Sequence, residues 1–485
     1  MGASIAAMTI PACQFIPKIG ANHPNVLFIA VDDLNDWVNG LGGRPGVHTP
    51  NIDRLAERGV LFTNAHCSAP ACNPSRASIM TGIRPSTSGI YNNRQHWRES
   101  PMLDDAKTIP EHFRSQGYRT IGGGKIFHCL SWIKTQYGTD ENDYAIWDGY
   151  FPSKSQSMAE SIWPRGTVRD EEGTFKWSPI AKGKTDWRPS YFFDWGPLKK
   201  PEEEMADFKV VDWAIEELKK KHEKPFFQAV GIFRPHIPWF VPKKYFNLYP
   251  LDKISLPPVT ENDLDDCSPV GKRFCRRKWQ EWILQNDLWK NAVQAYLASI
   301  SFADAQVGRL LDALDASPHA ENTIIVLWSD HGMHIGEKEH WEKFTLWEES
   351  TRVPLIIVAP GVTNRGGRCK RPVSLLDVYP TLVELCGNTP SPVLEGQSLV
   401  PLLRNPDASR ERPAVTTWGF NNHAIRTERW RYIRYNDDSE ELYDHQRDPN
   451  EYTNLAGQKE YDDIKTQLAD WLPQTNALLE IQYGN

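Results

Sequence analysis

Five short runs of apolar residues, each bounded by polar or turn-forming residues, predict buried strands. These runs span residues 25–31, 118–124, 225–233, 323–329 and 353–359. Runs of this length and composition are typical of strands buried on both faces of a sheet. Between the runs, residues 205–221 and 298–316 place apolar side chains at helical spacing, with charged side chains opposite. This alternation predicts an α/β protein with a largely parallel sheet.

Two segments and both ends of the chain depart from this pattern. Residues 130–200 and 250–290 are rich in Trp and interrupted by Gly and Pro, which is typical of long loops over a site. After about residue 405, short alternating runs precede a final amphipathic stretch at 462–479. We therefore predict three parts, an N-terminal tail or signal remnant, a main domain and a smaller antiparallel C-terminal subdomain: residues 1–24, 25–405 and 406–485.

Composition restricts the classes of function. The 485 residues are 40% hydrophobic and 24% charged, as in globular proteins that fold in water. A net charge of -7 argues against a nucleic-acid or anionic-membrane partner. The sequence after residue 24 contains no run of 18 apolar residues, so we predict no membrane span there. The 19 Trp, 16 Tyr and 19 Phe suit either stacking on sugar faces or large aromatic cores.

The eight cysteines show neither CxxC nor zinc-ligand spacing. Cys267 and Cys275 share one polar segment and either pair or, as we favour, stay free. The opening residues "MGASIAAMTIPACQF" look like the tail of a secretory signal, which favours a secreted or periplasmic protein.

Ionisable residues follow four of the predicted strands. Each of them alone is as readily explained as a helix cap or a turn residue. Because ligands bind beyond the carboxyl ends of strands in an open α/β sheet, four such strand ends together favour a site. The residues, in strand order along the chain, are Asp32 and Asp33, Lys125 and His128, Arg234 and His236, and Asp330 and His331.

Three of these residues, Asp32, Asp33 and Asp330, would repel one another in a buried site. A hard divalent cation, Ca²⁺ or Mg²⁺, removes that repulsion and prefers oxygen ligands. Positive charge is added by a set of nearby groups: Lys125, His128, His236 and Lys343. A metal ringed by cationic donors suits a tetrahedral oxyanion, either sulfate or phosphate.

The stretch "SAPACNPSRASIMTG" places Cys72 at the start of a predicted helix that runs from Pro74 to Gly82. A helix N-terminus lowers the basicity of a thiol, and Arg76 lies one turn further on. A nucleophilic thiolate is one interpretation, but hard cations prefer oxygen to sulfur.

The pattern Cys72-Asn73-Pro74-Ser75-Arg76, followed by Thr81-Gly82, resembles the C-x-P-S-R…T-G signature of the type I sulfatases. Further similarity lies in "NVLFIAVDDL", "GYRTIGGGKIFH", "SDHGMHIGEKEHWEK" and "TRVPLIIVAPG", and it extends over residues 25 to 460. "GKIFH" and "FRPHIPW" resemble the branch that contains iduronate 2-sulfatase. The resemblance implies an alkaline-phosphatase-like fold, a catalytic domain at 25–405, and conversion of Cys72 to Cα-formylglycine by a maturation enzyme.

The resemblance also implies roles for the residues. The implied ligands of Ca²⁺, or of Mg²⁺, are Asp32, Asp33, Cys72 as formylglycine, Asp330 and His331. His331 departs from the family, in which most members have Asn. The catalytic groups would be Arg76 on the formylglycine hydroxyl, His236 as general acid and His128 as acceptor of the second hydroxyl proton. Lys125 and Lys343 would neutralise the sulfuryl oxygens.

The implied substrate is a sulfated carbohydrate from which an exo-acting enzyme removes a 2-O-sulfate at a terminal sugar. A uronate carboxylate on that sugar would need a cationic partner, for which the candidates are Arg234, Arg94 and Arg98.

Two other functions stay open. The first is a phosphodiesterase or phosphonate monoester hydrolase of the same superfamily. A two-metal phosphatase would need a second cluster of Asp and His residues, and the sequence offers only one such cluster. A glycan-binding protein without catalysis would keep the Cys72 thiol. "GGGK" at 122–125 lacks the P-loop pattern, and the histidines at 331, 334 and 340 lack an HExxH frame.

Overall fold

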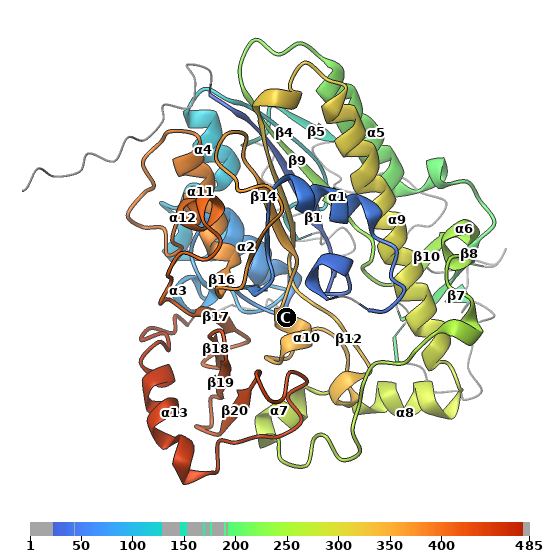
Figure 1. The fold of residues 1–485 in the computed structure, drawn as a ribbon, viewed down its shortest axis with the longest axis vertical. Coiled ribbons are helices and arrows are strands. Elements are labelled where there is room, and N and C mark those ends of the chain that lie inside the picture. Colours follow the sequence, from blue (N-terminus) through green and yellow to red (C-terminus); the bar gives the residue numbers. More distant parts are fainter. Residues whose placement is uncertain are drawn as a thin grey trace, which may run out of the picture.

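An eight-stranded sheet forms the centre of the computed structural model, which describes residues 23–42, 44–128, 146–152, 168–169, 175–176, 189–190 and 193–478 (Figure 1). All strands run in the same direction except β14, which is antiparallel to both of its neighbours. From edge to edge, the strands are β15 (Gly367–Cys369), β2 (Val60–Phe62), β14 (Leu355–Val358), β11 (Thr323–Ser329), β1 (Asn25–Val31), β9 (Phe226–Ile232), β4 (Arg119–Gly124) and β5 (Gly149–Phe151).

Both faces of this sheet are buried, which explains the continuous apolar runs. In β1, Leu27 and Ile29 point into one hydrophobic core, whereas Val26 and Phe28 point into the other. Successive side chains of a strand face opposite sides, so a strand between two helical layers needs apolar residues throughout.

Helices cover the two faces as separate layers (Figure 1). The first core contains residues of α1 (Pro50–Arg58), α5 (Ala206–Lys219), α6 (Lys243–Phe246) and α9 (Trp289–Asp315). The second contains residues of α2 (Cys72–Thr81), α4 (Ile109–Ser115), α11 (Val378–Leu385) and α12 (Val400–Arg404). Other helices of the described residues are α3 (Pro85–Ser88), α7 (Pro269–Phe274), α8 (Arg277–Gln285) and α10 (Glu348–Thr351).

The C-terminal part forms a four-stranded antiparallel sheet beside the main sheet, packed against α13 (Asp462–Ala469) (Figure 1). Its strands are β17 (Ala414–Thr417), β18 (His423–Arg426), β19 (Trp430–Arg434) and β20 (Glu440–Asp444). Two-stranded pairs complete the fold: β3 (Ala65–His66) with β16 (Val373–Ser374), β8 (Trp195–Leu198) with β10 (Trp239–Pro242), β12 (His334–Ile335) with β13 (Trp341–Glu342), and β6 (Val168–Arg169) with β7 (Phe175–Lys176).

The predicted fold class is confirmed, and the differences have physical causes. The stretch 250–290 is not one long loop, because α7 and α8 lie within it. The last helix ends at Ala469 instead of reaching 479, in keeping with Pro473 further on, which restricts helical backbone. Cys267 and Cys275 are free thiols. Most of 130–200 and the signal-like residues 1–22 lie outside the described residues, and the boundary at 405 stays a prediction.

Candidate active site

The carboxyl ends of β1 and β11 bring the predicted acidic residues together. The two strands pair in parallel with Val31 opposite Ser329, so Asp32 and Asp33 emerge beside Asp330. Asp33 has a left-handed backbone conformation, φ 58°, and its N–H donates to Asp330 Oδ1 at 3.1 Å. All three aspartates are fully buried, so their charges need compensation within the protein.

Arg76 joins two of these carboxylates. From the second turn of α2, its Nη2 donates to Asp32 Oδ1 at 2.9 Å and its Nε to Asp330 Oδ2 at 2.8 Å. Its Nη1 donates to the carbonyl oxygens of Lys125 and Ile126 at 2.6 and 2.9 Å. The planar guanidinium therefore crosslinks the ends of β1, β4 and β11 through the geometry that only Arg offers. Its predicted contact with a formylglycine hydroxyl stays a prediction.

Cys72 lies at the first position of α2, facing the cationic groups. Its Sγ lies 3.3 Å from His331 Nε2 and 3.6 Å from Lys125 Nζ. Burial opposes ionisation of this thiol, but Lys125, Lys343 and His331 together hold its pKa well below the usual range. The residue at this position is therefore held in a strongly anion-stabilising environment.

The two predicted lysines are buried beside the aspartates. Lys343 Nζ donates to both oxygens of Asp33, at 2.7 and 2.9 Å, and Lys125 Nζ donates to Asp32 Oδ2. Burial disfavours the charge on Lys343, but Asp33 and Cys72 raise its pKa above the ordinary value. Both ammonium groups therefore stay charged, which is what binding of an oxyanion requires.

The two predicted acid–base histidines differ in environment. His236 Nδ1 donates to the Ile237 carbonyl at 2.5 Å, so Nε2 faces Asp33 Oδ2 at 3.9 Å on a side chain that is 16% exposed. His128 is buried and hydrogen-bonds the Cys72 side chain. Burial lowers the pKa of His128 and keeps its imidazole neutral, although the Cys72 interaction acts in the opposite direction. His128 is thus suited to accept a proton, and His236 is accessible to a leaving group.

Four of the five predicted metal ligands form a tight group. The ligand atoms of Asp32, Asp33, Cys72 and His331 all lie within 4.8 Å of one another, and all four residues are buried. His331 Nδ1 donates to the Gly332 carbonyl at 3.0 Å, which orients Nε2 toward the group as in metal-binding histidines. Asp330 lies beside this group, and its carboxylate is occupied by Arg76 and by backbone N–H groups. Two carboxylates, an imidazole and an oxygen-bearing residue 72 would suit a hard divalent cation.

The three arginines proposed for a substrate carboxylate differ in their surroundings. Arg234 is only 2% exposed, and its Nε donates to the Phe240 carbonyl at 3.3 Å. Burial lowers the pKa of Arg234 to about 10, although Asp207 opposes this. Arg98 is paired with Glu111 at 2.8 Å, and Arg94 is exposed. Arg234 also interacts electrostatically with Asp32 of the buried cluster, so its proposed role in binding a substrate carboxylate stays a prediction.

Two buried residues that the sequence reasoning missed position the site. Tyr296 in α9 donates its hydroxyl proton to the Asp33 carbonyl at 2.8 Å and accepts from the Asn35 N–H at 3.1 Å. Asp207 in α5 accepts from the Phe233 N–H at 2.7 Å and so anchors the segment that leads to His236. Asp207 lies within the predicted helical stretch 205–221, and Tyr296 lies just before the stretch 298–316. The pattern of apolar residues does not reveal a distant partner for either side chain.

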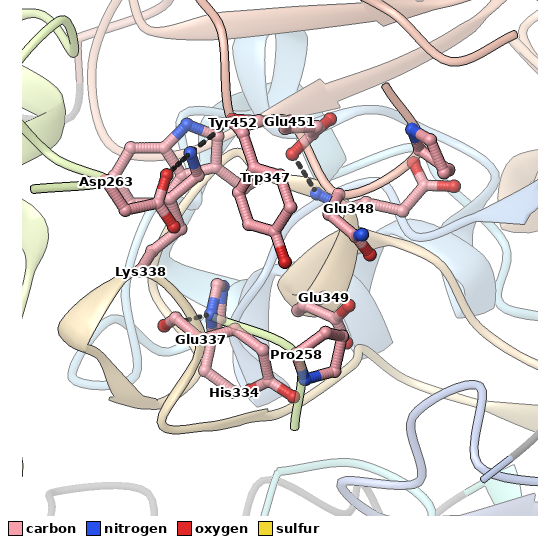
Figure 2. A pocket seen from close by; sticks show the side chains of 12 residues that line it. Pro258, Asp263, His334, Glu337, Lys338, Trp347, Glu348, Glu349, Glu451 and Tyr452 are labelled. Atoms are coloured by element: carbon pink, nitrogen blue, oxygen red, sulfur yellow. Dashed lines mark hydrogen bonds and ion pairs between the residues drawn. The ribbon is translucent and has the colours of Figure 1, made fainter. Parts of the chain in front are cut away.

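Figure 2 shows a polar pocket between the segment that carries Lys343 and the C-terminal subdomain. Lys338 spans it, donating to Asp263 Oδ1 at 2.6 Å and to the carbonyl of Glu451. The N–H of Glu348 donates to Glu451 Oε2 at 2.9 Å. These contacts attach the Lys343 segment to the subdomain.

A second group of metal-ligand type borders this pocket. The ligand atoms of Glu348, His445 and Glu451 lie within 4.8 Å of one another. Arg426 pairs with Glu348 at 3.1 Å, and Arg431 pairs with Glu451 at 2.5 Å and also with Glu348. Because the two arginines already neutralise the carboxylates, this group serves as an ion-pair network.

An α/β sheet of the alkaline-phosphatase-like type, with a buried metal-ligand group and cationic oxyanion donors at its strand ends, defines a hydrolase of sulfate or phosphate esters. The comparisons with known proteins narrow this class. The sulfatase family matches residues 24–388, and the family of N-sulphoglucosamine sulphohydrolase C-terminal regions matches residues 336–477. The chain belongs to the sulfatase family and is thus a sulfuric ester hydrolase.

Individual relatives agree with this assignment. A sulfatase of Formosa agariphila is 41% identical over 465 residues, which are 94% of this chain and 87% of that protein. Human iduronate 2-sulfatase is 36% identical over 353 residues, 70% of this chain and 60% of that protein. The structure of a phosphonate monoester hydrolase from Silicibacter pomeroyi superposes with a TM-score of 0.73 at 21% identity, covering 92% of this chain and 94% of that one, and so shares the fold. None of the described helices has the length and hydropathy that a membrane crossing requires.

Proposed function

We propose that the protein hydrolyses a sulfate ester on a sulfated carbohydrate, acting on a 2-O-sulfate of a terminal sugar. The observation that carries the proposal is the buried group around Cys72, in which metal ligands and two charged lysines converge on one side chain. The similarity to human iduronate 2-sulfatase supports the choice of a terminal 2-O-sulfated sugar. The buried ammonium groups of Lys125 and Lys343 suit a sulfuryl group, which carries its charge on peripheral oxygens.

Asp32, Asp33 and His331, with residue 72, would hold a Ca²⁺ ion, or Mg²⁺, and Asp330 would support them through Arg76. When present, the metal and the Cα-formylglycine made from Cys72 supply a polarising cation and a hydrated aldehyde as oxygen nucleophile. Conversion of Cys72 would require a maturation enzyme, which is therefore a partner of this protein. A secreted or periplasmic location of this protein fits a role in the breakdown of glycans.

The chain's own residues orient the substrate and move protons. Lys125 and Lys343 hold their ammonium groups beside Cys72 and Asp33, where they would neutralise sulfuryl oxygens. His236, whose Nδ1 proton is held by the Ile237 carbonyl, would donate from Nε2 to the leaving sugar oxygen. His128, buried and neutral, would accept the proton of the second hydroxyl at residue 72.

Mass spectrometry of the tryptic peptide 59–76, from a host that has the maturation enzyme, tests the central step. This peptide contains Cys67 as well as Cys72, so Cys67 is an internal control that should be alkylated as an ordinary thiol. We expect residue 72 to resist alkylation and to carry a lighter, aldehyde-bearing side chain. An intact thiol at both positions would contradict the proposal and leave a glycan-binding protein without catalysis.

A panel of substrates then separates sulfate from phosphate chemistry. We expect release of sulfate from an oligosaccharide that ends in a 2-O-sulfated sugar, with little action on a phosphodiester or a phosphonate monoester. Preferred turnover of a phosphonate monoester would favour the other chemistry known for this fold. Efficient turnover of aryl sulfates without action on any 2-O-sulfated sugar would overturn the substrate while leaving the reaction in place.

A further inference from the structure

Partly exposed aromatic residues border the otherwise buried catalytic cluster. Phe344 directly follows Lys343, and its ring centre lies 5.8 Å from Lys343 Nζ. The N–H of Phe344 donates to the carbonyl of Pro70, two residues before Cys72, at 3.0 Å. The Phe344 ring is therefore held at the edge of the proposed sulfate site.

Two further side chains extend this edge from distant parts of the chain. The ring of Trp418, in the turn between β17 and β18, lies 5.2 Å from the Phe344 ring at an angle of 35°. The guanidinium carbon of Arg276, between α7 and α8, lies 5.2 Å from the Phe344 ring and 4.5 Å from the Trp279 ring. Like Phe344, Trp418 and Arg276 are partly exposed.

Arg276 is held in place but keeps donors for a ligand. Its Nη1 pairs with Glu342 at 3.0 Å, and its side chain remains 34% exposed. Among the described residues, no hydrogen bond engages its Nε or Nη2. A guanidinium that is fixed between two rings and open along one edge is suited to bind a carboxylate or sulfate group.

Phe344 has an uncommon conformation for its position. Its φ of 85° lies in the left-handed region, which a bulky side chain seldom adopts, and such residues concentrate at functional sites. In the described part of the chain, its ring joins none of the hydrophobic core clusters. Core packing therefore does not explain this aromatic residue.

We propose that Phe344, Trp418 and Arg276 form the sugar subsite of the enzyme. The two rings contact the face of a pyranose, and Arg276 binds an acidic substituent of the substrate, either a uronate carboxylate or a second sulfate. This inference rests on the proposed function, since it places a sugar beside the group that Lys343 binds. It replaces Arg234, Arg94 and Arg98 as the partner of the acidic substituent.

Binding measured without turnover tests the subsite separately from the reaction. The protein carries Cys72→Ser, and calorimetry follows binding of a disaccharide with a uronate 2-sulfate at its non-reducing end. Adding Arg276→Gln should weaken binding about 10- to 100-fold, as expected for loss of a charge-assisted hydrogen bond pair. The matched control is Arg277→Gln, because Arg277 pairs with Glu339 at 2.7 Å on an exposed surface. We expect the control to bind like the parent.

Two modified probes identify the acidic group. If Arg276 binds the carboxylate, the carboxyl-reduced disaccharide should bind equally to the parent and to Arg276→Gln. If Arg276 binds a second sulfate, the disaccharide that lacks that sulfate should bind equally to the parent and to Arg276→Gln. Phe344→Leu should weaken all of these sugars, while Trp471→Leu, at an exposed Trp of the subdomain, should weaken none.

The outcomes separate the two proposals. Unchanged affinity of Arg276→Gln for every probe, or no binding of the disaccharide to the Cys72→Ser protein, would overturn the subsite. Tight, Arg276-dependent binding of a disaccharide that the mature enzyme does not hydrolyse would support the subsite and contradict the proposed reaction.

Discussion

Replacing Arg76 by Lys tests how the metal-ligand carboxylates are held. The substitution keeps the positive charge but removes the planar fork that bonds Asp32, Asp330 and two backbone carbonyls. A lysine ammonium ends at one point, so it can reach one of the two carboxylates. A hydrogen bond to a charged group contributes about 1.5–3 kcal/mol, and leaving a buried carboxylate without its partner costs at least as much. We therefore expect a loss of about 3 kcal/mol of unfolding free energy.

The same change should weaken the metal site. Asp32 belongs to the ligand group, and Asp330 accepts a hydrogen bond from the N–H of Asp33, another member of that group. Loosening Asp32 and Asp330 should therefore raise the Ca²⁺ concentration required for half-maximal activity. If the transition state is destabilised by the same amount, about 3 kcal/mol, kcat/KM should fall about 150-fold.

The assay combines urea unfolding, followed by Trp fluorescence, with sulfate release over a range of Ca²⁺ concentrations. Arg410→Lys is the matched control, because Arg410 is well buried, pairs with Asp377 at 2.6 Å and donates to the Pro372 carbonyl, away from Cys72. It should lose comparable stability without a change in Ca²⁺ requirement. Wild-type stability and Ca²⁺ requirement in Arg76→Lys, with kcat/KM within threefold, would refute this reasoning.

Three further predictions concern the metal, its support and the subdomain. Chelation should abolish sulfate release, and Ca²⁺ should restore it better than Zn²⁺ does, because oxygen ligands dominate the site; full activity in metal-free protein would contradict the ligand assignment. Tyr296→Phe should lose about 1–3 kcal/mol of unfolding free energy and raise the Ca²⁺ requirement. The control Tyr249→Phe removes a buried hydroxyl bonded to the His48 N–H and should destabilise the fold without changing the Ca²⁺ requirement. Burial opposes the charge of Glu451, but Arg431 and His445 lower its pKa from 4.5 to about 2. The charged form is thus favoured by folding, and about 3 kcal/mol should be lost as the pH falls from 4.5 to 2. Unfolding free energies measured across this range should lose that dependence in Glu451→Gln.

Local patterns in the chain determine the elements and the chemistry at their ends. The apolar runs place β1 at residues 25–31 and β11 at 323–329, as the structure has them, because a strand between two helical layers must be apolar throughout. The helix start at Cys72 and its end at Gly82, φ 75°, likewise follow from local rules. Since parallel strands end at one edge of a sheet, the convergence of Asp32, Asp33 and Asp330 is predictable without coordinates.

Contacts between distant segments required the tertiary structure. The antiparallel direction of β14 depends on how its connections run, and an apolar run carries no direction. The bonds that Arg76 makes to Asp32 and Asp330 were not predictable, since its long side chain can reach several partners and the sequence does not rank them. Tyr296 supports Asp33 across 263 residues, and Phe344, Trp418 and Arg276 meet from three separate turns. Whether a segment forms a helix or a strand depends on short-range periodicity, which can be read directly from one sequence. Which distant side chains meet depends on how the whole chain packs, and that arrangement appears only in the folded structure.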